Sequence, residues 1–430
     1  MRKLAIAIFL LLIGSLPACA EQPVAAYQFT NSAGVNTHLH YGPLYTDNFA
    51  LILQRLRELG VQHVRNGLQS TIRPEFSDHV KAVNQAGIKV LWILNTDQSS
   101  DLAFSYTNLF PNGSDGFEAP NEFDASQQSN WATLMKQYMT RIYPELKHDS
   151  RTSRLLIVGP SLTRSDSYNL LGVQTSYMDV ANLHNYPGGR NPGTVGWGAP
   201  DNAGARYGSI AWNLDLGKNV WGTKPVWTTE YGYSNSAAAK DHVPEDIAAI
   251  YMPRALLEQY LHGIRRTYLF ELLSAHPDDN DGVYGLLRAD GSPKPAFTAI
   301  SNFLHLLHDD SPNPSLLSMQ FVLEGELTDV HHLLLQKSDA SYYLLLWLEK
   351  PGYDVDAGKR IQVPPQNISV HFEQPAADFE SYQLSSTGAI VQKKEQLENQ
   401  RVSLNVGETV LVLHFNHVPP PPTDLTIQPK

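Results

Sequence analysis

The chain has 430 residues, of which 42% are hydrophobic and 17% are charged, a composition typical of a globular protein with a large core and not of a disordered one. Its formal net charge of −11 argues against nucleic acid or an anionic membrane surface as the main partner. The only cysteine, Cys19, excludes an intrachain disulfide and a cluster of thiolate metal ligands.

Residues 1–20 have the pattern of a signal peptide. A basic start is followed by an apolar stretch, residues 4–12, which is too short to span a bilayer. The sequence Leu16-Pro17-Ala18-Cys19-Ala20 resembles a bacterial lipobox, in which Cys19 would be lipidated, and it also fits an ordinary cleavage site. We therefore expect an exported protein. It is either an outer-membrane or cell-surface lipoprotein that meets the membrane only through Cys19, or a free periplasmic or extracellular protein.

After a short linker, residues 21–33, the chain alternates strand-like and helix-like segments as far as residue 308. Eight segments, most of them rich in valine, isoleucine, leucine and aromatic residues, have the character of buried parallel strands. They cover residues 34–36, 61–68, 88–95, 116–121, 155–159, 180–185, 225–230 and 266–273. This α/β pattern predicts a (β/α)8 TIM barrel over residues 34–308.

Helices are expected between most of these strands. Residues 48–59 place their apolar side chains on one helical face and end before Gly60, and residues 76–86 end before Gly87 in the same way. Further helices are expected at residues 131–146, 244–262 and 295–307. The connection 96–115 lacks a clean helical period, and residues 188–204 are rich in glycine and proline. Both predict long loops, the first with a short helix in it, at the strand ends where barrel enzymes bind ligands.

Residues 309–315 contain two prolines, two aspartates and two serines, and they mark a domain boundary. Short alternating runs follow and predict a small all-β sandwich over residues 316–417. Its strands are expected at residues 333–336, 342–348, 361–363, 368–372, 402–406 and 410–415. The proline-rich residues 418–430 are expected to form an exposed tail.

Two glutamates stand at the ends of apolar strand-like runs. Glu122 ends the run Phe117-Glu118-Ala119-Pro120-Asn121-Glu122, and Glu230 follows Trp227-Thr228-Thr229 and precedes Tyr231-Gly232. About three strand-and-helix units separate them, so a barrel would carry both to one face. Two carboxylates on one face are what glycoside hydrolysis with retention requires, because one protonates the leaving oxygen and the other attacks the anomeric carbon. The alternative is that both are ordinary surface glutamates.

The strand-end Asn121-Glu122 pair, followed by Glu230 before an aromatic residue and a glycine, resembles clan A of the glycoside hydrolases, which are retaining (β/α)8 barrels. The resemblance covers residues 34–308, and the following sandwich is similar to the C-terminal module of several clan members. No individual family is assigned. The resemblance implies that Glu122 is the general acid/base, that Glu230 is the nucleophile, and that Asn121 bonds the sugar 2-hydroxyl. It implies no metal and no organic cofactor.

Three more residues match the clan pattern. Arg65, on the second strand, matches an arginine that holds the nucleophile, and the alternative is a surface salt bridge. His184 and Tyr186 resemble the clan's His-x-Tyr motif at the end of the sixth strand. They would bind sugar hydroxyls and donate a hydrogen bond to Glu230, respectively, unless they are a packed aromatic pair.

Further substrate contacts are expected at other strand ends and loops. Trp197 is a candidate aromatic platform for a sugar ring, whereas Trp92 is expected in the core. Glu271 stands where clan members commonly have a tryptophan, and it would accept a bond from a sugar hydroxyl or pair with Arg265 or Arg266. Asn36 and Asn95 end the first and third strands and complete the candidate substrate-binding set, and weaker aromatic candidates are Tyr41, Tyr231 and Tyr233.

A zinc site built from His38, His40 and His184 is a disfavoured alternative, because their spacing gives no strong ligand set. The leading hypothesis is a retaining glycosidase that needs no cofactor and acts on an oligosaccharide, a polysaccharide or a smaller glycoside. The second is a noncatalytic carbohydrate-binding surface lipoprotein on a barrel scaffold. Hydrolysis and transglycosylation share the same residues. The sandwich either braces the barrel, which we favour, or binds glycan.

Overall fold

The computed structural model describes residues 20–198, 208–274 and 283–417. The expected signal peptide, except for Ala20, and the proline-rich tail lie outside these residues. Among the helices described, none has both the length and the apolar character needed to cross a membrane.

Within the described residues, eight parallel strands form the barrel, in the order β7-β6-β5-β4-β3-β10-β9-β8. An isolated parallel bridge between Val158 and Val180 joins the two outer strands and closes the sheet. Each strand overlaps one of the segments expected from the sequence, which confirms the barrel. The strands are β3 (Ala33–Asn36), β4 (His63–Gly67), β5 (Lys89–Ile93), β6 (Ser114–Glu118), β7 (Leu156–Val158), β8 (Ala181–His184), β9 (Val226–Tyr231) and β10 (Arg266–Leu269).

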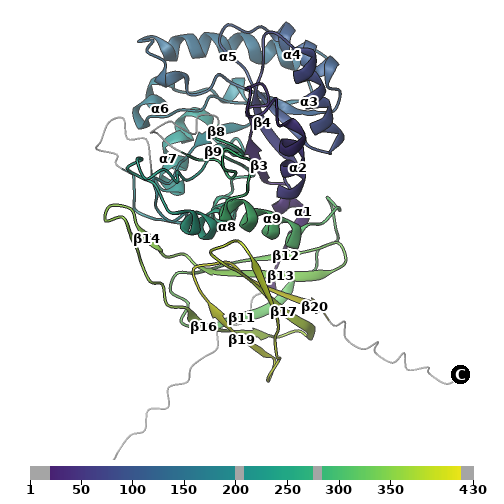
Figure 1. Cartoon of the computed structure of the whole chain (residues 1–430), viewed down its shortest axis with the longest axis vertical. Coiled ribbons are helices and arrows are strands. Elements are labelled where there is room, and N and C mark those ends of the chain that lie inside the picture. Colours follow the sequence, from purple (N-terminus) through teal and green to yellow (C-terminus); the bar gives the residue numbers. More distant parts are fainter. Residues whose placement is uncertain (1–19, 199–207, 275–282, 418–430) are drawn as a thin grey trace, which may run out of the picture.

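Helices surround this sheet (Figure 1). They are α2 (Phe49–Leu59), α3 (Pro74–Gln85), α4 (Ser100–Leu109), α5 (Trp131–His148), α6 (Ser165–Leu171), α7 (Ile210–Trp221), α8 (Glu245–Leu261) and α9 (Pro295–Leu307). The connection 96–115 contains all ten residues of α4, more than the short helix expected, because Ala103, Tyr106 and Thr107 form a buried helical face. The sequence analysis missed α6 and α7, and in α7 the side chain of Ser209 caps the first turn by accepting from Trp212 N.

The segment expected as a linker, residues 21–33, also has regular structure. β1 (Ala20–Glu21) pairs with one sheet of the sandwich and β2 (Val24–Ala25) with the other. The short helix α1 (Ala26–Thr30) follows, and the ring of Phe29 packs edge-on against Tyr260 and Phe303. The sequence analysis missed these elements because each is too short to show a periodic pattern.

The C-terminal residues form a sandwich of two mainly antiparallel sheets, as expected. Among described residues the sheet orders are β1-β11-β16-β19 and β18-β17-β20-β13-β12-β2, and a separate pair is formed by β14 (Tyr353–Asp354) and β15 (Lys359–Arg360). The long strands are β11 (Met319–Gly325), β12 (Val330–Gln336), β13 (Ser341–Leu348), β16 (Gln366–Phe372), β17 (Ala376–Leu384), β18 (Ile390–Lys394), β19 (Arg401–Val406) and β20 (Leu411–His417). The expected strand at 361–363 is wrong, since those residues pair with no strand.

The larger sheet of the sandwich lies against α8 and α9 on the outside of the barrel (Figure 1). Every residue of β13 is buried, and alternate side chains serve two cores. Tyr343, Leu345 and Trp347 belong to the core shared with the barrel, whereas the intervening leucines fill the space between the two sheets. Every residue from Ile247 to Tyr260 on α8 is buried, as expected for a helix covered on both sides.

Candidate active site

Arg65 is the centre of a buried polar cluster at the carboxyl end of the barrel. Its side chain is 2% exposed and reaches two carboxylates. The guanidinium donates to both oxygens of Glu118, from Nε at 2.8 Å and from NH2 at 2.7 Å, and NH1 donates to Oε1 of Glu230 at 2.7 Å. These buried contacts rule out the exposed salt bridge that was the alternative for Arg65. The two carboxylates raise the pKa of Arg65 despite the opposing effect of burial, so it stays charged.

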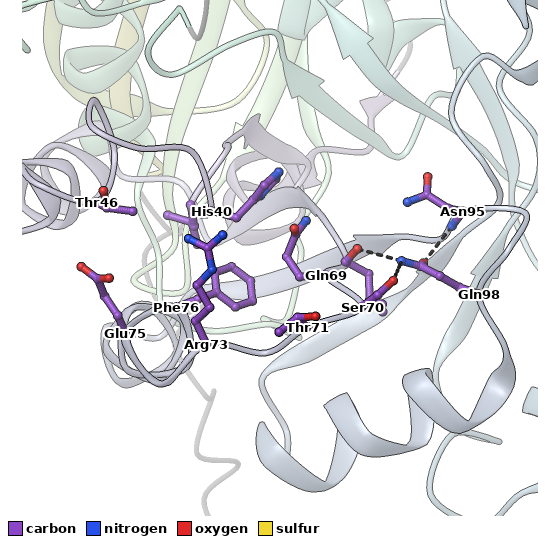
Figure 2. A pocket seen from close by; sticks show the side chains of 12 residues that line it. His40, Thr46, Gln69, Ser70, Thr71, Arg73, Glu75, Phe76, Asn95 and Gln98 are labelled. Atoms are coloured by element: carbon purple, nitrogen blue, oxygen red, sulfur yellow. Dashed lines mark hydrogen bonds between the residues drawn. The ribbon is translucent and has the colours of Figure 1, made fainter.

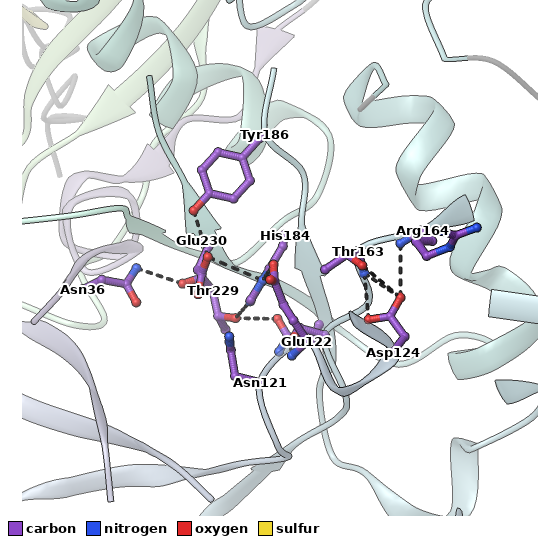
Figure 3. Close-up of polar contacts among 12 residues, drawn as sticks. Asn36, Asn121, Glu122, Asp124, Thr163, Arg164, His184, Tyr186, Thr229 and Glu230 are labelled. Atoms are coloured by element: carbon purple, nitrogen blue, oxygen red, sulfur yellow. Dashed lines mark hydrogen bonds and ion pairs between the residues drawn. The ribbon is translucent and has the colours of Figure 1, made fainter. Parts of the chain in front are cut away.

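Glu230 lies on β9 and is fixed from both sides. Arg65 holds one of its carboxylate oxygens, and the hydroxyl of Tyr186 donates to the other at 2.8 Å (Figure 3). Its side chain is 9% exposed. The two hydrogen bonds fix the orientation of the carboxyl group, and the bond from the charged Arg65 is the stronger kind.

A β-bulge in β9 aims two consecutive side chains into the barrel. On β8, Leu183 lies opposite Thr228 and His184 lies opposite Glu230, so Thr229 is an extra residue. In a regular strand, neighbours point to opposite faces. Here the hydroxyl of Thr229 contacts Asn182 at 2.7 Å and Glu118 at 3.2 Å, while Glu230 reaches Arg65. The bulge therefore places both side chains in one cluster.

Glu122 leaves β6 through an unusual backbone turn. Its φ of 42° and ψ of 41° lie in the left-handed region, which is uncommon for residues other than glycine. Its backbone N–H donates to Oγ of Ser161 at 3.1 Å, and the following turn is tied down because Asp124 accepts from Thr163 and Arg164 (Figure 3). With 31% of its side chain exposed, Glu122 is more open to solvent than Glu230.

His184 connects the two glutamates. Its Nδ1 lies 2.8 Å from Oε1 of Glu122 and 3.5 Å from Oε2 of Glu230, and these ring and carboxylate atoms all lie within 4.8 Å of one another. Its Nε2 faces the hydroxyl of Thr229 at 3.0 Å. Burial lowers the pKa of His184, but the carboxylates of Glu230 and Glu122 outweigh burial and raise it above the ordinary value.

We expect the effect of His184→Asn on stability to depend on pH. Because the folded pKa of His184 is raised, the charged ring stabilises the fold below the unfolded pKa of about 6.5, and this contribution disappears as pH rises through the folded value. The Tm gap between wild type and His184→Asn should be widest near pH 6 and shrink by about 2–4 °C toward pH 9. Thermal unfolding followed by circular dichroism measures this, and a gap that grows with pH would contradict the charged state.

Two asparagines that were expected to bind substrate contact Arg65. Asn36 accepts from Arg65 NH1 at 2.9 Å and donates to the backbone oxygen of Thr229 at 3.0 Å, so its amide is engaged within the protein. Asn121 accepts from Arg65 NH2 at 2.6 Å. Its amide nitrogen has no hydrogen bond within the described residues, so it is available to a ligand beside Glu122.

Glu271 follows β10 and is 5% exposed. Its Oε2 lies 2.9 Å from Nε2 of His38, whose ring stacks on Tyr41 with centroids 4.7 Å apart. The alternative in which Glu271 pairs with Arg265 or Arg266 is therefore wrong. Arg266 instead bonds Asp115 at 3.0 Å near the amino end of the barrel, and Arg265 lies over the ring of Tyr260.

Asn95 lines a cleft of about 330 Å³ formed by the loops that follow β3, β4 and β5 (Figure 2). Its backbone N–H donates to Gln98, and its exposed side chain has no hydrogen-bond partner among the described residues. The other lining residues are Leu39, His40, Thr46, Leu68, Gln69, Ser70, Thr71, Arg73, Glu75, Phe76 and Gln98. The cleft opens on the same end of the barrel as Glu122 and Glu230, since all follow the carboxyl ends of parallel strands.

The aromatic candidates lie in different places. Trp197 is partly exposed, and the guanidinium carbon of Arg190 lies 4.3 Å from its ring centroid. Trp92 is in the core, as expected. Tyr231 and Tyr233 are 1% and 2% exposed and contact each other through their hydroxyls, so they are not open platforms.

The three histidines of the zinc alternative contact different groups. His38 contacts Glu271, His184 contacts Glu122 and Glu230, and Nδ1 of His40 lies 3.4 Å from the amide of Asn66. Among the described residues, the side chains close enough together to hold a metal ion are Glu122, His184 and Glu230, and this group does not include His38 or His40.

Sequence reasoning missed Glu118, which is fully buried and binds Arg65 with both oxygens. It also missed Asn182, which donates to Glu118 at 2.9 Å. The signal for Glu118 was a charged residue inside a strand expected to be buried on both faces, because such a charge needs an opposite partner.

No protein-family model matches the chain, and no curated protein matches its sequence. Solved structures do share its fold. A family 39 glycoside hydrolase from Bacteroides cellulosilyticus WH2 has a TM-score of 0.63 and 16% identity, over 91% of this chain and 82% of that one. A glucosidase from Croceicoccus marinus has a TM-score of 0.59 and 10% identity, over 93% and 98%.

The catalytic domain of a family 30 xylanase C from Talaromyces cellulolyticus has a TM-score of 0.55 and 11% identity, over 93% of this chain and 98% of that one. All three comparisons cover the barrel and much of the sandwich together. The chain therefore has the fold of clan A glycoside hydrolases, as the resemblance in sequence predicted.

Proposed function

We propose that the protein is a retaining glycoside hydrolase in which Glu230 is the nucleophile and Glu122 is the general acid/base. The observation that carries this proposal is the separation of the pair, whose nearest oxygens lie within 4.8 Å of each other at the carboxyl end of the barrel. Retaining enzymes have carboxyl groups about 5–5.5 Å apart, and inverting enzymes leave room for a water between groups about 6.5–9.5 Å apart. The separation therefore supports double displacement.

The environments of the two carboxylates support different roles. Glu230 is buried and receives hydrogen bonds from Arg65 and Tyr186, so its carboxyl group is held in place for attack on the anomeric carbon. Glu122 is more exposed, and its Oε1 lies 2.8 Å from Nδ1 of His184, a position from which it can protonate the leaving oxygen and then take a proton from water. The amide nitrogen of Asn121 is available to the 2-hydroxyl, where a bond strengthens as positive charge develops on the ring.

In the first step, the bond from Glu230 to the anomeric carbon forms as the glycosidic bond breaks, and the proton on Glu122 goes to the departing oxygen. In the second step, ionised Glu122 removes a proton from water, and the water oxygen displaces Glu230 from the anomeric carbon. Two inversions give net retention. A sugar hydroxyl in place of water would give transglycosylation by the same residues.

The cleft at the same end of the barrel as the pair supports a substrate with more than one sugar unit. Most of its lining residues are polar or charged and can bond sugar hydroxyls, and Leu39, Leu68 and Phe76 complete the lining. Arg73 and Glu75 form no ion pair with each other in the described part of the chain, so both can bind hydroxyls. Burial, together with the charges of His38 and Arg73, lowers the pKa of His40 to about 4, which leaves its ring neutral. Because the positive charge of Arg73 and the negative charge of Glu75 balance, we propose that a neutral sugar unit binds in the cleft.

Product analysis tests the proposed reaction. Aryl glycosides of several sugars would first identify the sugar that is cleaved, and proton NMR of the fresh product would then give its anomeric configuration. We expect the product to appear first in the configuration of the substrate and to mutarotate afterwards. A product that appears first with the opposite configuration would exclude Glu230 as a nucleophile.

We expect Asn95→Ala to weaken binding of longer substrates selectively. Losing one hydrogen bond of about 1–1.5 kcal/mol should raise KM for an oligosaccharide by roughly 10-fold, with much less effect on an aryl monoglycoside that does not reach the cleft. Steady-state kinetics on both substrates measures this. Asn219→Ala, on the exposed surface of α7, is the matched control. An equal effect on both substrates would argue against the cleft as a sugar site.

A further inference from the structure

A carboxylate of the sandwich contacts the loop that follows β8 of the barrel. Glu349 comes directly after β13, and its Oε1 accepts from the side chain of Asn191 and from the backbone N–H of Gly193, both at 2.8 Å. The same carboxylate bonds Arg254 of α8, from Nε at 2.9 Å and from NH2 at 2.6 Å. One acidic group therefore joins the sandwich, a barrel helix and a loop at the active-site end.

The contact is buried. The side chains of Arg254 and Glu349 are 0% and 1% exposed. Arg254 also donates to the backbone oxygens of Lys350 and Glu408, and Trp347 donates to Glu349 at 3.1 Å, so the charges are well satisfied. A buried ion pair is weak evidence for stability, since apolar residues can replace it without loss. The well-defined geometry of the contact between Arg254 and Glu349 indicates a role in positioning instead of stability.

The loop fits closely against the sandwich. A Cβ atom on Gly193 would lie 2.4 Å from Cγ of Glu349, so only glycine permits this approach. Gly189 has a φ of 75°, and a Cβ there would lie 2.5 Å from Cγ2 of Val355 in the turn between β14 and β15. Two glycines of one loop thus sit against two separate parts of the sandwich.

The same loop is joined to the proposed catalytic residues. It begins at Tyr186, whose hydroxyl donates to Glu230. At its middle, the backbone oxygen of Arg190 accepts from Tyr233, which follows β9 and Glu230 along the chain. The residue before Tyr186, Asn185, exchanges hydrogen bonds of 3.2 Å with Gln259 of α8. The loop therefore lies between Glu349 on one side and the nucleophile strand on the other.

We propose that Glu349 is a positioning residue for the reaction, which holds the loop after β8 so that the hydroxyl of Tyr186 stays on Glu230. The inference rests on the proposed function, and it makes the sandwich a working part of the active site instead of a brace alone. When the anchor is lost, the loop shifts and Glu230 loses one of its donors. Misplacement of a catalytic contact by about 1 Å costs up to about 100-fold in rate.

A double-mutant cycle in the full-length protein tests the coupling. Glu349→Ala, Tyr186→Phe and the double variant would be compared by kcat/KM on the aryl glycoside that wild type cleaves best. We expect Glu349→Ala to lower kcat by roughly 10- to 100-fold with little change in KM. The double variant should be about as slow as Tyr186→Phe alone, because both changes remove the same contact.

Two further variants separate positioning from stability. Asn191→Ala removes one of the two loop donors to Glu349 and keeps the buried pair of Arg254 and Glu349, so it should fold and should lower kcat less than Glu349→Ala does. Leu404→Ala, in the core between the two sheets and 4% exposed, lowers stability without touching the loop, and it should leave kcat unchanged. Hydrogen exchange of residues 186–194 should rise in Glu349→Ala and not in Leu404→Ala.

Multiplicative losses in the double variant, or unchanged exchange of residues 186–194 in both Glu349→Ala and Asn191→Ala, would overturn the positioning role while leaving the proposed hydrolase intact. If the wild-type protein cleaves no glycoside but hydrogen exchange of residues 186–194 still rises when Glu349 is replaced, the proposed function is overturned. The role of Glu349 as an anchor of the loop would then remain.

Discussion

Replacing Glu230 by glutamine should lower kcat on an aryl glycoside by at least about 10⁴-fold, the scale of loss expected when a nucleophile is removed. Glutamine keeps the shape of the side chain, so Arg65 and Tyr186 can keep hydrogen-bond partners, but its amide cannot form the glycosyl-enzyme ester. KM should change far less than kcat. Stopped assays with long incubation are needed to measure the residual rate.

The control for Glu230→Gln is the same kind of change at the other end of the barrel. Asp115 is a buried carboxylate near the start of β6, where it contacts His63 and Arg266. Asp115→Asn should alter stability more than kcat, because it lies away from the proposed reaction centre. Full activity in Glu230→Gln would remove the basis of the proposed mechanism.

Replacing Glu122 by alanine should give a loss that depends on the leaving group. Without a general acid, a glycoside with a poor leaving group should react about 10²- to 10⁴-fold more slowly. A dinitrophenyl glycoside needs little protonation and should still form the glycosyl-enzyme. Added azide should then speed turnover and give a glycosyl azide of retained configuration, because a small anion needs no general base to attack.

The azide experiment distinguishes the two glutamates. In a Glu230 variant with a small side chain, such as Glu230→Gly, azide would attack the substrate directly and give the inverted product. If Glu122→Ala yields the inverted azide, the roles of the pair are exchanged. A loss that is the same for all leaving groups, with no effect of azide, would show that Glu122 is not the acid/base.

Most barrel strands were predictable because they are apolar runs between polar segments, and buried parallel strands must have that composition. Glu122 and Glu230 were visible for the same reason, as charges at the ends of such runs. The contacts of Glu230 with Arg65 and Tyr186 follow once the strand ends are brought to one side, whereas the contact of His184 with Glu122 was not predicted. These are the parts of the site that depend on strand position alone.

The other contacts of the site depend on three-dimensional geometry that no local sequence pattern encodes. The bulge at Thr229 breaks the two-residue period, so the sequence alone would place Thr229 and Glu230 on opposite faces. Asn36 and Asn121 were expected to face substrate, yet both accept from Arg65, because a buried guanidinium takes every acceptor within reach. The contact of Glu349 with Asn191 joins residues far apart in the chain, which only the packed structure reveals.

The placement of β1 and β2 has a consequence for how the molecule is made. Ala20 pairs with Gln320 and Val24 with Leu335, so the first two strands of the described chain pair with strands that follow the entire barrel in sequence. The sandwich is therefore completed last during synthesis, and its two sheets contain strands from both ends of the described chain. Any excised barrel that starts after α1 also loses the packing of Phe29 on Tyr260 and Phe303. Engineering that swaps the sandwich must accordingly carry the amino-terminal strands with it.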